Sequence, residues 1–167
     1  MHSSHTFDSV PPGFSITDFN SLPLKERVAA ATQVARLERK IFPAMEGFDY
    51  DVELKKKNTG LLLAFREGTQ DNVVAYLVFQ RMKRSVWLHK LCVIEQERQK
   101  GIGRCLVQTL RVQMQRSGGE SIWLWVDEHR RPAKRLYDAC GFKQVEVRSD
   151  YYAPGRAGLK MELLIGT

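Results

Sequence analysis

A glycine-bearing loop between an apolar run and an amphipathic segment constrains the fold of this chain more than any other stretch. The apolar run spans residues 87–94, the loop carries Gly101 and Gly103, and apolar residues then recur at every fourth position from Ile102 to Met114. This pattern predicts a strand, a turn and the start of a long helix. The unpaired N–H groups and the dipole of such a helix N-terminus favour anions, and glycine lets the backbone approach a phosphate closely.

Length and composition are those of one globular domain. The chain has 167 residues, of which 43% are hydrophobic and 27% charged. It has neither the run of ~20 apolar residues that a transmembrane helix needs nor the pattern of a signal peptide. We therefore expect a cytoplasmic protein without a membrane partner, with a mobile arm at residues 1–12 and one domain at residues 13–167. The three cysteines fit no metal or redox spacing, and we expect Cys92 and Cys105 to fill the core.

Positive charge is concentrated in and after the glycine loop. The formal net charge is +7, and residues 98–135 hold nine Lys or Arg side chains against three acidic ones. A solvated basic surface, a nucleic-acid site and a small ligand with several phosphates all fit this clustering. Composition alone does not choose among them.

Periodicity and turn residues predict the other elements. Strands are expected near residues 14–17, 61–66, 73–81, 85–94, 122–126, 142–148 and 159–165, and helices near 21–41, 50–57, 102–116 and 131–140. Ser21 is the expected N-cap of the first helix. The order β-α-α-β-β-β-α-β-α-β-β predicts a single α/β domain with a mixed central sheet of about seven strands flanked by helices. The strands on either side of the glycine-loop helix should be parallel neighbours, because a crossover helix joins them.

Two segments of the chain carry a family resemblance. Residues 98–103 read R-Q-K-G-I-G, and residues 133–142 read A-K-R-L-Y-D-A-C-G-F. In this order and spacing they resemble the two hallmark motifs of the GNAT superfamily of acetyl-CoA-dependent N-acetyltransferases, over roughly residues 14–165. The resemblance implies the GNAT fold, acetyl-CoA as the cofactor and no metal.

The resemblance also implies the cofactor site. The backbone of the strand that ends near Val93 would pair with the pantetheine arm, and amides at residues 98–104 would hold the pyrophosphate. The implied cofactor-binding set is Leu91, Cys92, Val93, Arg98, Gln99, Lys100, Gly101, Ile102, Gly103, Arg104, Arg130 and Ala133. Tyr137 matches the family tyrosine that protonates the departing thiolate. Arg130 stands where relatives often have an asparagine.

A finer similarity concerns the acceptor. Ile41-Phe42-Pro43 and the later pair Tyr151-Tyr152 resemble the loop and the hairpin that close over the substrate in protein N-terminal α-amine acetyltransferases. The implied substrate-binding set is Phe42, Pro43, Ala44, Trp87, Trp125, Tyr151 and Tyr152. A loop packed on the core and a packed hairpin are the structural alternatives.

Two tryptophans occupy the positions where the family usually provides a general base. Neither Trp87 nor Trp125 can accept a proton. At pH 7, forming the neutral amine adds roughly 1.4 kcal/mol to the activation free energy for an α-amine with a pKa near 8. For a lysine the same step adds about 4.5 kcal/mol. The missing base therefore favours an α-amino acceptor. His89 is the candidate base, because strand alternation places it on the face of Trp87 and Leu91. A structural role for this histidine, Glu46 as the base, and a water relay are the alternatives.

The resemblance thus implies direct transfer of acetyl from acetyl-CoA to a primary amine, with the N-terminal α-amine of a protein or peptide favoured. A GNAT enzyme acting on a small-molecule amine or a lysine side chain is one alternative, and a non-catalytic acyl-CoA-binding module is another. The expected partners are acetyl-CoA and the amine, with the chain a monomer or a homodimer. Nucleic-acid binding ranks below all of these.

Overall fold

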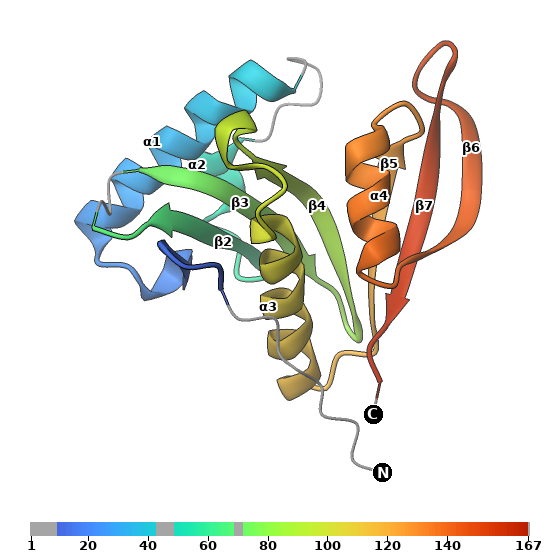
Figure 1. Cartoon of the computed structure of the whole chain (residues 1–167). Coiled ribbons are helices and arrows are strands. Elements are labelled where there is room, and N and C mark those ends of the chain that lie inside the picture. The colour runs from blue at the N-terminus through green and yellow to red at the C-terminus, as the bar shows by residue number, and fades with distance from the viewer. Residues whose placement is uncertain (1–9, 43–48, 69–71, 167) are drawn as a thin grey trace.

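One mixed sheet with helices on both faces forms the framework of the chain, whose computed structural model describes residues 10–42, 49–68 and 72–166 (Figure 1). The strands are β1 (Phe14–Asp18), β2 (Thr59–Arg66), β3 (Val73–Arg81), β4 (Ser85–Val93), β5 (Ser121–Asp127), β6 (Lys143–Ala153) and β7 (Arg156–Leu164). The helices are α1 (Leu24–Ile41), α2 (Tyr50–Glu53), α3 (Ile102–Arg116) and α4 (Arg131–Ala139), with 3₁₀ turns at Phe19–Ser21 and Glu95–Glu97. The predicted fold class and order of elements are confirmed.

The sheet is divided where its parallel strands meet. Its strand order is β1-β2-β3-β4-β5-β7-β6, and β4 and β5 pair in parallel, as predicted. Their ladder runs only from Ser85–Ser121 to Trp87–Trp123. Beyond this point the two strands diverge (Figure 1), so the rest of β4 and β5 do not pair with each other. The short ladder leaves a β1–β4 half and a β5–β7 half joined at one end.

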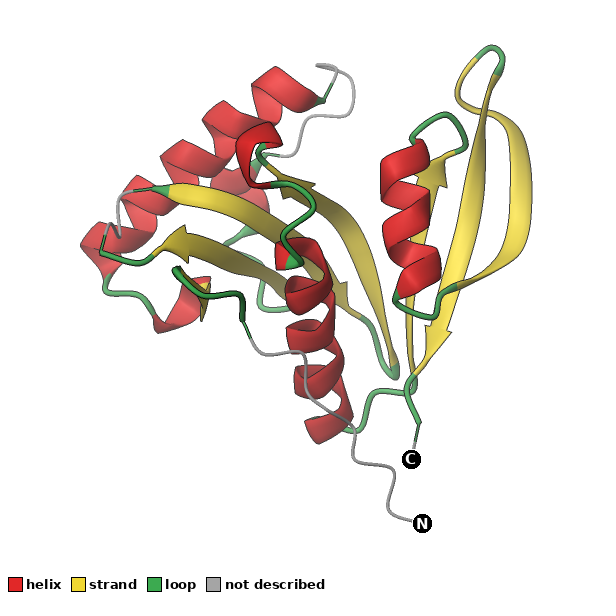
Figure 2. Ribbon diagram, in the orientation of Figure 1, coloured by secondary structure: helices red, strands yellow, loops and turns green. Residues whose placement is uncertain are grey.

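Helices cover the two halves differently. α3 packs on β2, β3 and β4, and α4 lies on the same side of the other half, whereas α1 and α2 lie behind the β1–β4 half (Figures 1 and 2). Two hydrophobic cores result. The core on the α3 and α4 side contains Leu106 and Met161, and the core under α1 contains Val34 and Tyr76. The four-residue spacing of apolar side chains in α3 is therefore the spacing of its buried face.

Some element boundaries differ from the predicted ones. Ser21 does not cap α1, which begins at Leu24, because its hydroxyl donates to the Asp18 carbonyl and belongs to a separate 3₁₀ turn. α2 is four residues long, and β6 extends to Ala153. β6 is an edge strand with mostly exposed side chains, so it lacks the apolar alternation that would mark its length in the sequence.

A β-bulge in β4 overturns one predicted orientation. The β3–β4 register passes over His89, because Leu88 and Lys90 pair with consecutive residues of β3. The His89 ring lies 3.7 Å from the Trp87 ring, so these two residues share a face as predicted. Leu91, however, packs against the core on the α3 side. The prediction that His89 and Leu91 share a face is wrong, since the extra residue reverses the alternation beyond it.

Cys92 and Cys105 are buried, as expected. Within the described ranges, no helix is long and apolar enough to cross a membrane, and no group of three potential metal ligands occurs. The predicted substrate residues Pro43 and Ala44, the alternative base Glu46 and most of the predicted N-terminal arm lie outside the described residues.

Candidate active site

The loop between β4 and α3 lies at the end of β4 where β4 and β5 have diverged. Gln99 and Gly101 have left-handed φ angles of 63° and 87°. Left-handed residues at alternate positions turn neighbouring N–H groups to one side, which makes an anion-binding nest. Gly101 is also the N-cap of α3, whose first N–H groups have no intrahelical partner. The backbone of this loop therefore fits a pyrophosphate.

Side chains of this loop form hydrogen bonds with nearby protein groups and so stabilise the conformation of the loop. Glu97 is 3% exposed and accepts hydrogen bonds from Lys100, at 2.7 Å, and from Arg66. The bond from Lys100, together with Arg66, lowers the pKa of Glu97. The Arg98 Nε donates to the Val93 carbonyl at 3.0 Å, and the Arg98 backbone N–H donates to the carbonyl of residue 95. Of the amides predicted to bind the cofactor, those from Gln99 onward are therefore the candidates.

Gly103 sets how closely α3 approaches β4 and α4. A Cβ added here would lie 3.0 Å from a methyl carbon of Leu136 and 3.4 Å from one of Leu91. Because Leu136 belongs to α4 and Leu91 to β4, the missing side chain allows both halves of the molecule to pack closely against the start of α3. The two segments that carry the family resemblance thus meet in space.

We expect Gly101→Ala to weaken acetyl-CoA binding. An alanine at φ +87° is strained by roughly 1–2 kcal/mol, and relaxing the strain would turn the N–H groups of the nest. Gly68→Ala is the matched control, because Gly68 has φ +83°, has open space around its Cβ position and lies outside the loop. Isothermal titration calorimetry with CoA should show a higher Kd for the first variant alone. Equal Kd values for both variants would contradict the role of the nest.

Four aromatic side chains form two stacked pairs on one face of the sheet. Trp87 stacks on Trp123 with ring centroids 5.1 Å apart, and Trp125 stacks on Tyr151 at 4.6 Å. Tyr152 meets the Tyr151 ring edge-on at 4.9 Å. The intervening β5 residues, at positions 122, 124 and 126, belong to the core under α3 and α4, so both tryptophans of β5 point to the opposite face. The sequence prediction missed Trp123, although alternation with Trp125 would have identified it.

Phe42 lies between cations from the two halves of the sheet. The Lys90 ammonium is 4.5 Å from its ring centroid, and the Arg130 guanidinium is 4.2 Å from it. Lys90 belongs to β4, whereas Arg130 follows β5, so Phe42 spans the divergence of these strands from the end of α1. Glu38 accepts from Lys90 at 3.3 Å and from the Tyr50 hydroxyl at 2.7 Å. The resemblance assigned Arg130 to the cofactor, and the structure places it beside a predicted substrate residue.

Tyr137 is 6% exposed on α4, and its ring contacts Phe142 edge-on at 5.6 Å. Burial raises its pKa well above the usual range, with further contributions from Cys140 and Tyr152, while Arg130 acts in the opposite direction. The residues that influence its hydroxyl are the two caps of α4 (Cys140 and Arg130), Tyr152 of β6 and Cys92 of β4. Tyr137 is therefore a protonated phenol at neutral pH, close to the diverging strands.

The His89 imidazole is half-buried beside Trp87. Its Nε2 lies 3.1 Å from the Gln80 side-chain oxygen, so a neutral ring donates to this amide. Burial lowers the pKa of His89 to about 4, Glu53 acts against that shift, and Lys90 adds to it. The imidazole is thus neutral at pH 7, but it is a weaker base than an ordinary histidine.

This low pKa predicts a pH dependence of stability. Because the folded pKa lies near 4 and the unfolded value near 6.5, the unfolded chain binds more protons between these values. The contribution of His89 to stability is complete above pH 6.5 and is lost as the pH falls toward 4. We therefore expect the unfolding free energy of His89→Gln, measured in urea, to fall less than that of the wild type across this window. An equal change of unfolding free energy with pH in the two proteins would contradict this prediction.

Comparison with known proteins identifies the family. Residues 30–142 match the model of the acetyltransferase (GNAT) family.

The chain belongs to this family.

The family resemblance inferred from the two motifs is therefore confirmed. The chain is 29% identical to an N-alpha-acetyltransferase of Sulfurisphaera tokodaii over 143 residues, which cover 77% of this chain and 84% of the relative. It is 32% identical over 83 residues, or 50% of the chain, to a [ribosomal protein bS18]-alanine N-acetyltransferase of Haemophilus ducreyi, and spans only 57% of that relative's length.

Solved structures share the fold. The Escherichia coli ribosomal-protein-S18-alanine N-acetyltransferase superposes with a TM-score of 0.74 at 20% identity, covering 92% of this chain and 95% of the other. NAA60 of Arabidopsis thaliana, solved with acetyl-CoA, also gives 0.74, at 15% identity, covering 91% and 98% of the two chains. At such identities the likeness concerns the fold, including the mixed sheet described above.

Proposed function

We propose that the chain transfers the acetyl group of acetyl-CoA directly to a primary amine, and that the favoured acceptor is the N-terminal α-amine of a protein or peptide. The observation that carries the proposal is the divergence of β4 from β5, with the nest at its end and the stacked aromatic pairs on one face. An anion site and an aromatic face suited to the acceptor would thus lie on either side of the β4 edge that no longer pairs with β5.

The main-chain groups of this chain would bind and orient the thioester. The nest that begins at Gln99 would hold the pyrophosphate. The stretch Leu91–Val93 pairs with β3 but lies beyond the last β4–β5 pair. Its edge toward β5 is therefore available to the pantetheine arm, apart from the Val93 carbonyl, which accepts from Arg98. Acetyl-CoA supplies an acetyl group activated as a thioester. Backbone N–H groups of β4 are suited to stabilise the oxyanion that forms when the amine attacks, because they are fixed and partly shielded from water.

Tyr137 is the proposed general acid. Its raised pKa keeps the phenol protonated at neutral pH, so it has a proton to give to the departing thiolate. Arg130 and Tyr152 influence the same hydroxyl, and both border the acceptor face: one contacts Phe42, and the other contacts Tyr151.

Removal of the proton from the acceptor needs little help from side chains. Trp87 and Trp125 stand at the usual positions of the base and are fixed in aromatic stacks. His89, the predicted base, would accept a proton at a pKa near 4 from an ammonium near 8, an uphill step of about 5 kcal/mol. We therefore favour an acceptor that reacts already neutral, after its ammonium proton has exchanged with bulk solvent at a cost of about 1.4 kcal/mol at pH 7. His89 would then orient Trp87. About one-tenth of an α-amine is neutral at pH 7, which supports an N-terminal acceptor over a lysine.

The test is acetyl transfer from acetyl-CoA to a panel of acceptors. N-terminal peptides with a free α-amine are compared with the same peptides blocked at the N-terminus but carrying a lysine, and with polyamines and arylalkylamines. Acetylation of the free α-amines, located by mass spectrometry, is the expected result. Activity confined to the lysine peptides or to the small amines would reject the N-terminal acceptor. Tight binding of acetyl-CoA without transfer to any amine would favour a non-catalytic acyl-CoA-binding module.

A further inference from the structure

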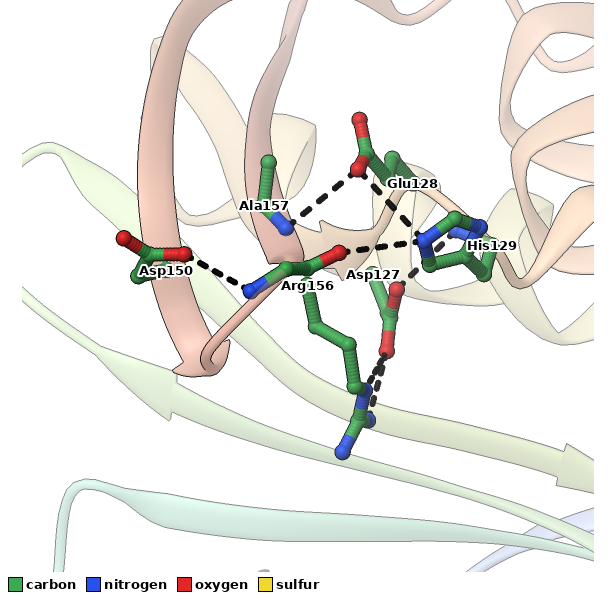
Figure 3. A network of polar contacts seen from close by, with 7 residues as sticks. Asp127, Glu128, His129, Asp150, Arg156 and Ala157 are labelled. Carbon is green, nitrogen blue, oxygen red and sulfur yellow. Dashed lines mark hydrogen bonds and ion pairs between the residues drawn. The ribbon is translucent and has the colours of Figure 1, made fainter.

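A polar network joins the end of β5 to the hairpin between β6 and β7 (Figure 3). Its centre is Asp127, which is 4% exposed. The Arg156 Nε and Nη2 both donate to Asp127 Oδ2, at 2.7 and 2.5 Å, and the His129 backbone N–H donates to Oδ1 at 2.9 Å. One buried carboxylate thus contacts both the loop after β5 and the first residue of β7.

Further bonds connect the same two segments. The Glu128 backbone N–H donates to the Ala157 carbonyl at 3.1 Å, and the Ala157 N–H donates to the Glu128 carboxylate at 3.4 Å. The Gly155 N–H donates to the Asp150 carboxylate at 2.7 Å, which closes the turn of the hairpin. We call residues 149–158 the tyrosine hairpin, because they carry Tyr151 and Tyr152 between the ends of β6 and β7.

The ion pair is connected to the acceptor face through aromatic contacts. The Arg156 guanidinium lies 5.7 Å from the Tyr152 ring centroid, and Tyr152 meets Tyr151 edge-on. Tyr151 stacks on Trp125, which precedes Asp127 by two residues on β5. Besides the β5–β7 ladder, which ends at the Asp127–Gly158 pair, the tyrosine hairpin thus contacts β5 through the ion pair and through the Trp125–Tyr151 stack.

We propose that Asp127 is a positioning residue that holds the tyrosine hairpin against β5 and thereby determines how tightly the amine acceptor binds. The inference rests on the proposed function, because it concerns the acceptor side of the same site. Asp127 itself does not touch the reacting atoms. It acts through Arg156 and Tyr152 on the aromatic face that the acceptor would meet.

The charges of the network suit this role at neutral pH. Burial alone would raise the pKa of Asp127, but the His129 N–H and the Arg156 guanidinium outweigh burial and hold the pKa below its usual range. The carboxylate therefore stays ionised and keeps its pair with Arg156. Arg156 is one-third exposed, so without the Asp127 carboxylate its guanidinium can turn to solvent and release the contact that ties the hairpin to β5.

Asp127→Asn is the first test, because asparagine keeps the shape of the side chain and removes its charge. We expect the KM for an N-terminal peptide to rise roughly tenfold, which corresponds to about 1.4 kcal/mol of acceptor binding. The kcat and the KM for acetyl-CoA should stay unchanged, because a loss of uniform substrate binding raises KM alone. Asp138→Asn is the matched control, since this exposed aspartate on α4 pairs only with Lys134 among the contacts that the structure defines. The control should leave both KM values unchanged.

A second measurement does not depend on activity. If Asp127 holds the hairpin, Asp127→Asn should speed trypsin cleavage after Arg148 and reduce the near-ultraviolet circular dichroism of the Trp125–Tyr151 stack. Gly158→Ala should give the same results with the ion pair intact, because its Cβ would lie 2.7 Å from the Tyr151 ring. This variant serves if Asp127→Asn does not fold.

A double-mutant cycle with Arg156→Gln separates positioning from simple destabilisation. If Asp127 acts through Arg156, the double variant should be no worse than either single variant in acceptor KM and in cleavage rate. Equal rises in the KM for the peptide and the KM for acetyl-CoA would overturn the inference. An unchanged cleavage rate in Asp127→Asn and Gly158→Ala would overturn it as well. If the wild type acetylates no amine, the proposed function fails, and cleavage and circular dichroism still decide whether Asp127 holds the hairpin.

Discussion

Replacing Tyr137 with phenylalanine is expected to lower kcat by about 10²- to 10⁴-fold, the usual contribution of a general acid. The phenol is buried and protonated at neutral pH, and Arg130 and Tyr152 are among the residues that influence it. Phenylalanine keeps the ring and its contact with Phe142, so the fold and the Kd for acetyl-CoA should not change. Steady-state kinetics with a saturating peptide and calorimetry with acetyl-CoA measure the two quantities separately.

Tyr76→Phe is the control for this experiment. Tyr76 is also a buried tyrosine, but it belongs to the core under α1 and not to the core that contains Tyr137. Its loss should leave kcat unchanged. If Tyr137→Phe turns over as fast as the wild type, another group protonates the thiolate, and the acid role of Tyr137 is wrong.

Gly60→Ala is expected to have the largest effect on stability of any single methyl group added to the sheet. Gly60 pairs directly with Phe79 across the β2–β3 ladder, and an added Cβ would lie 2.1 Å from the Phe79 Cζ. The Phe79 ring is 1% exposed in the core on the α3 side, so it cannot move into solvent. Overpacking of this kind costs about 1–3 kcal/mol, and each kcal/mol lowers Tm by about 2–4 °C in a domain of this size.

Two further variants make this prediction specific. Gly166→Ala should not change Tm, because nothing lies within 4 Å of its Cβ position. Phe79→Leu combined with Gly60→Ala should lose less stability than the two single losses added together, because the smaller side chain makes room for the methyl group. Thermal unfolding followed by circular dichroism measures all of these variants. A Tm of Gly60→Ala equal to that of the wild type would show that the Phe79 ring can adopt another position in the core.

Local sequence signals were sufficient for most of the fold. These signals are the four-residue spacing in α3, the apolar runs of β2 to β4 and the glycine after α4. Each of them extends over no more than about 15 consecutive residues. They therefore placed the elements in the right order. Such signals were weakest where burial is one-sided or slight, as in β6 and at the start of α1, where both predicted boundaries were displaced.

The candidate site was predictable to the extent that motifs mark it. The glycine loop and Tyr137 stand out in the sequence because a nest and a helix end need particular residue types at fixed spacing. Trp123 and Asp127 carry no such mark, since a tryptophan or an aspartate in a strand has many ordinary explanations. Their roles depend on partners 29 or more residues away, namely Trp87 and Arg156.

The sequence by itself thus determined the strand–loop–helix unit, the order of the elements and, through its motifs, the family, because these depend on short-range backbone preferences. Tertiary structure alone decided that β4 and β5 pair over only three positions, that a bulge turns His89 and Leu91 to opposite faces, and that Asp127 reaches Arg156. Each of these features arises where strands distant in sequence meet. Their registers are set by the packing of the whole sheet rather than by the residues nearby.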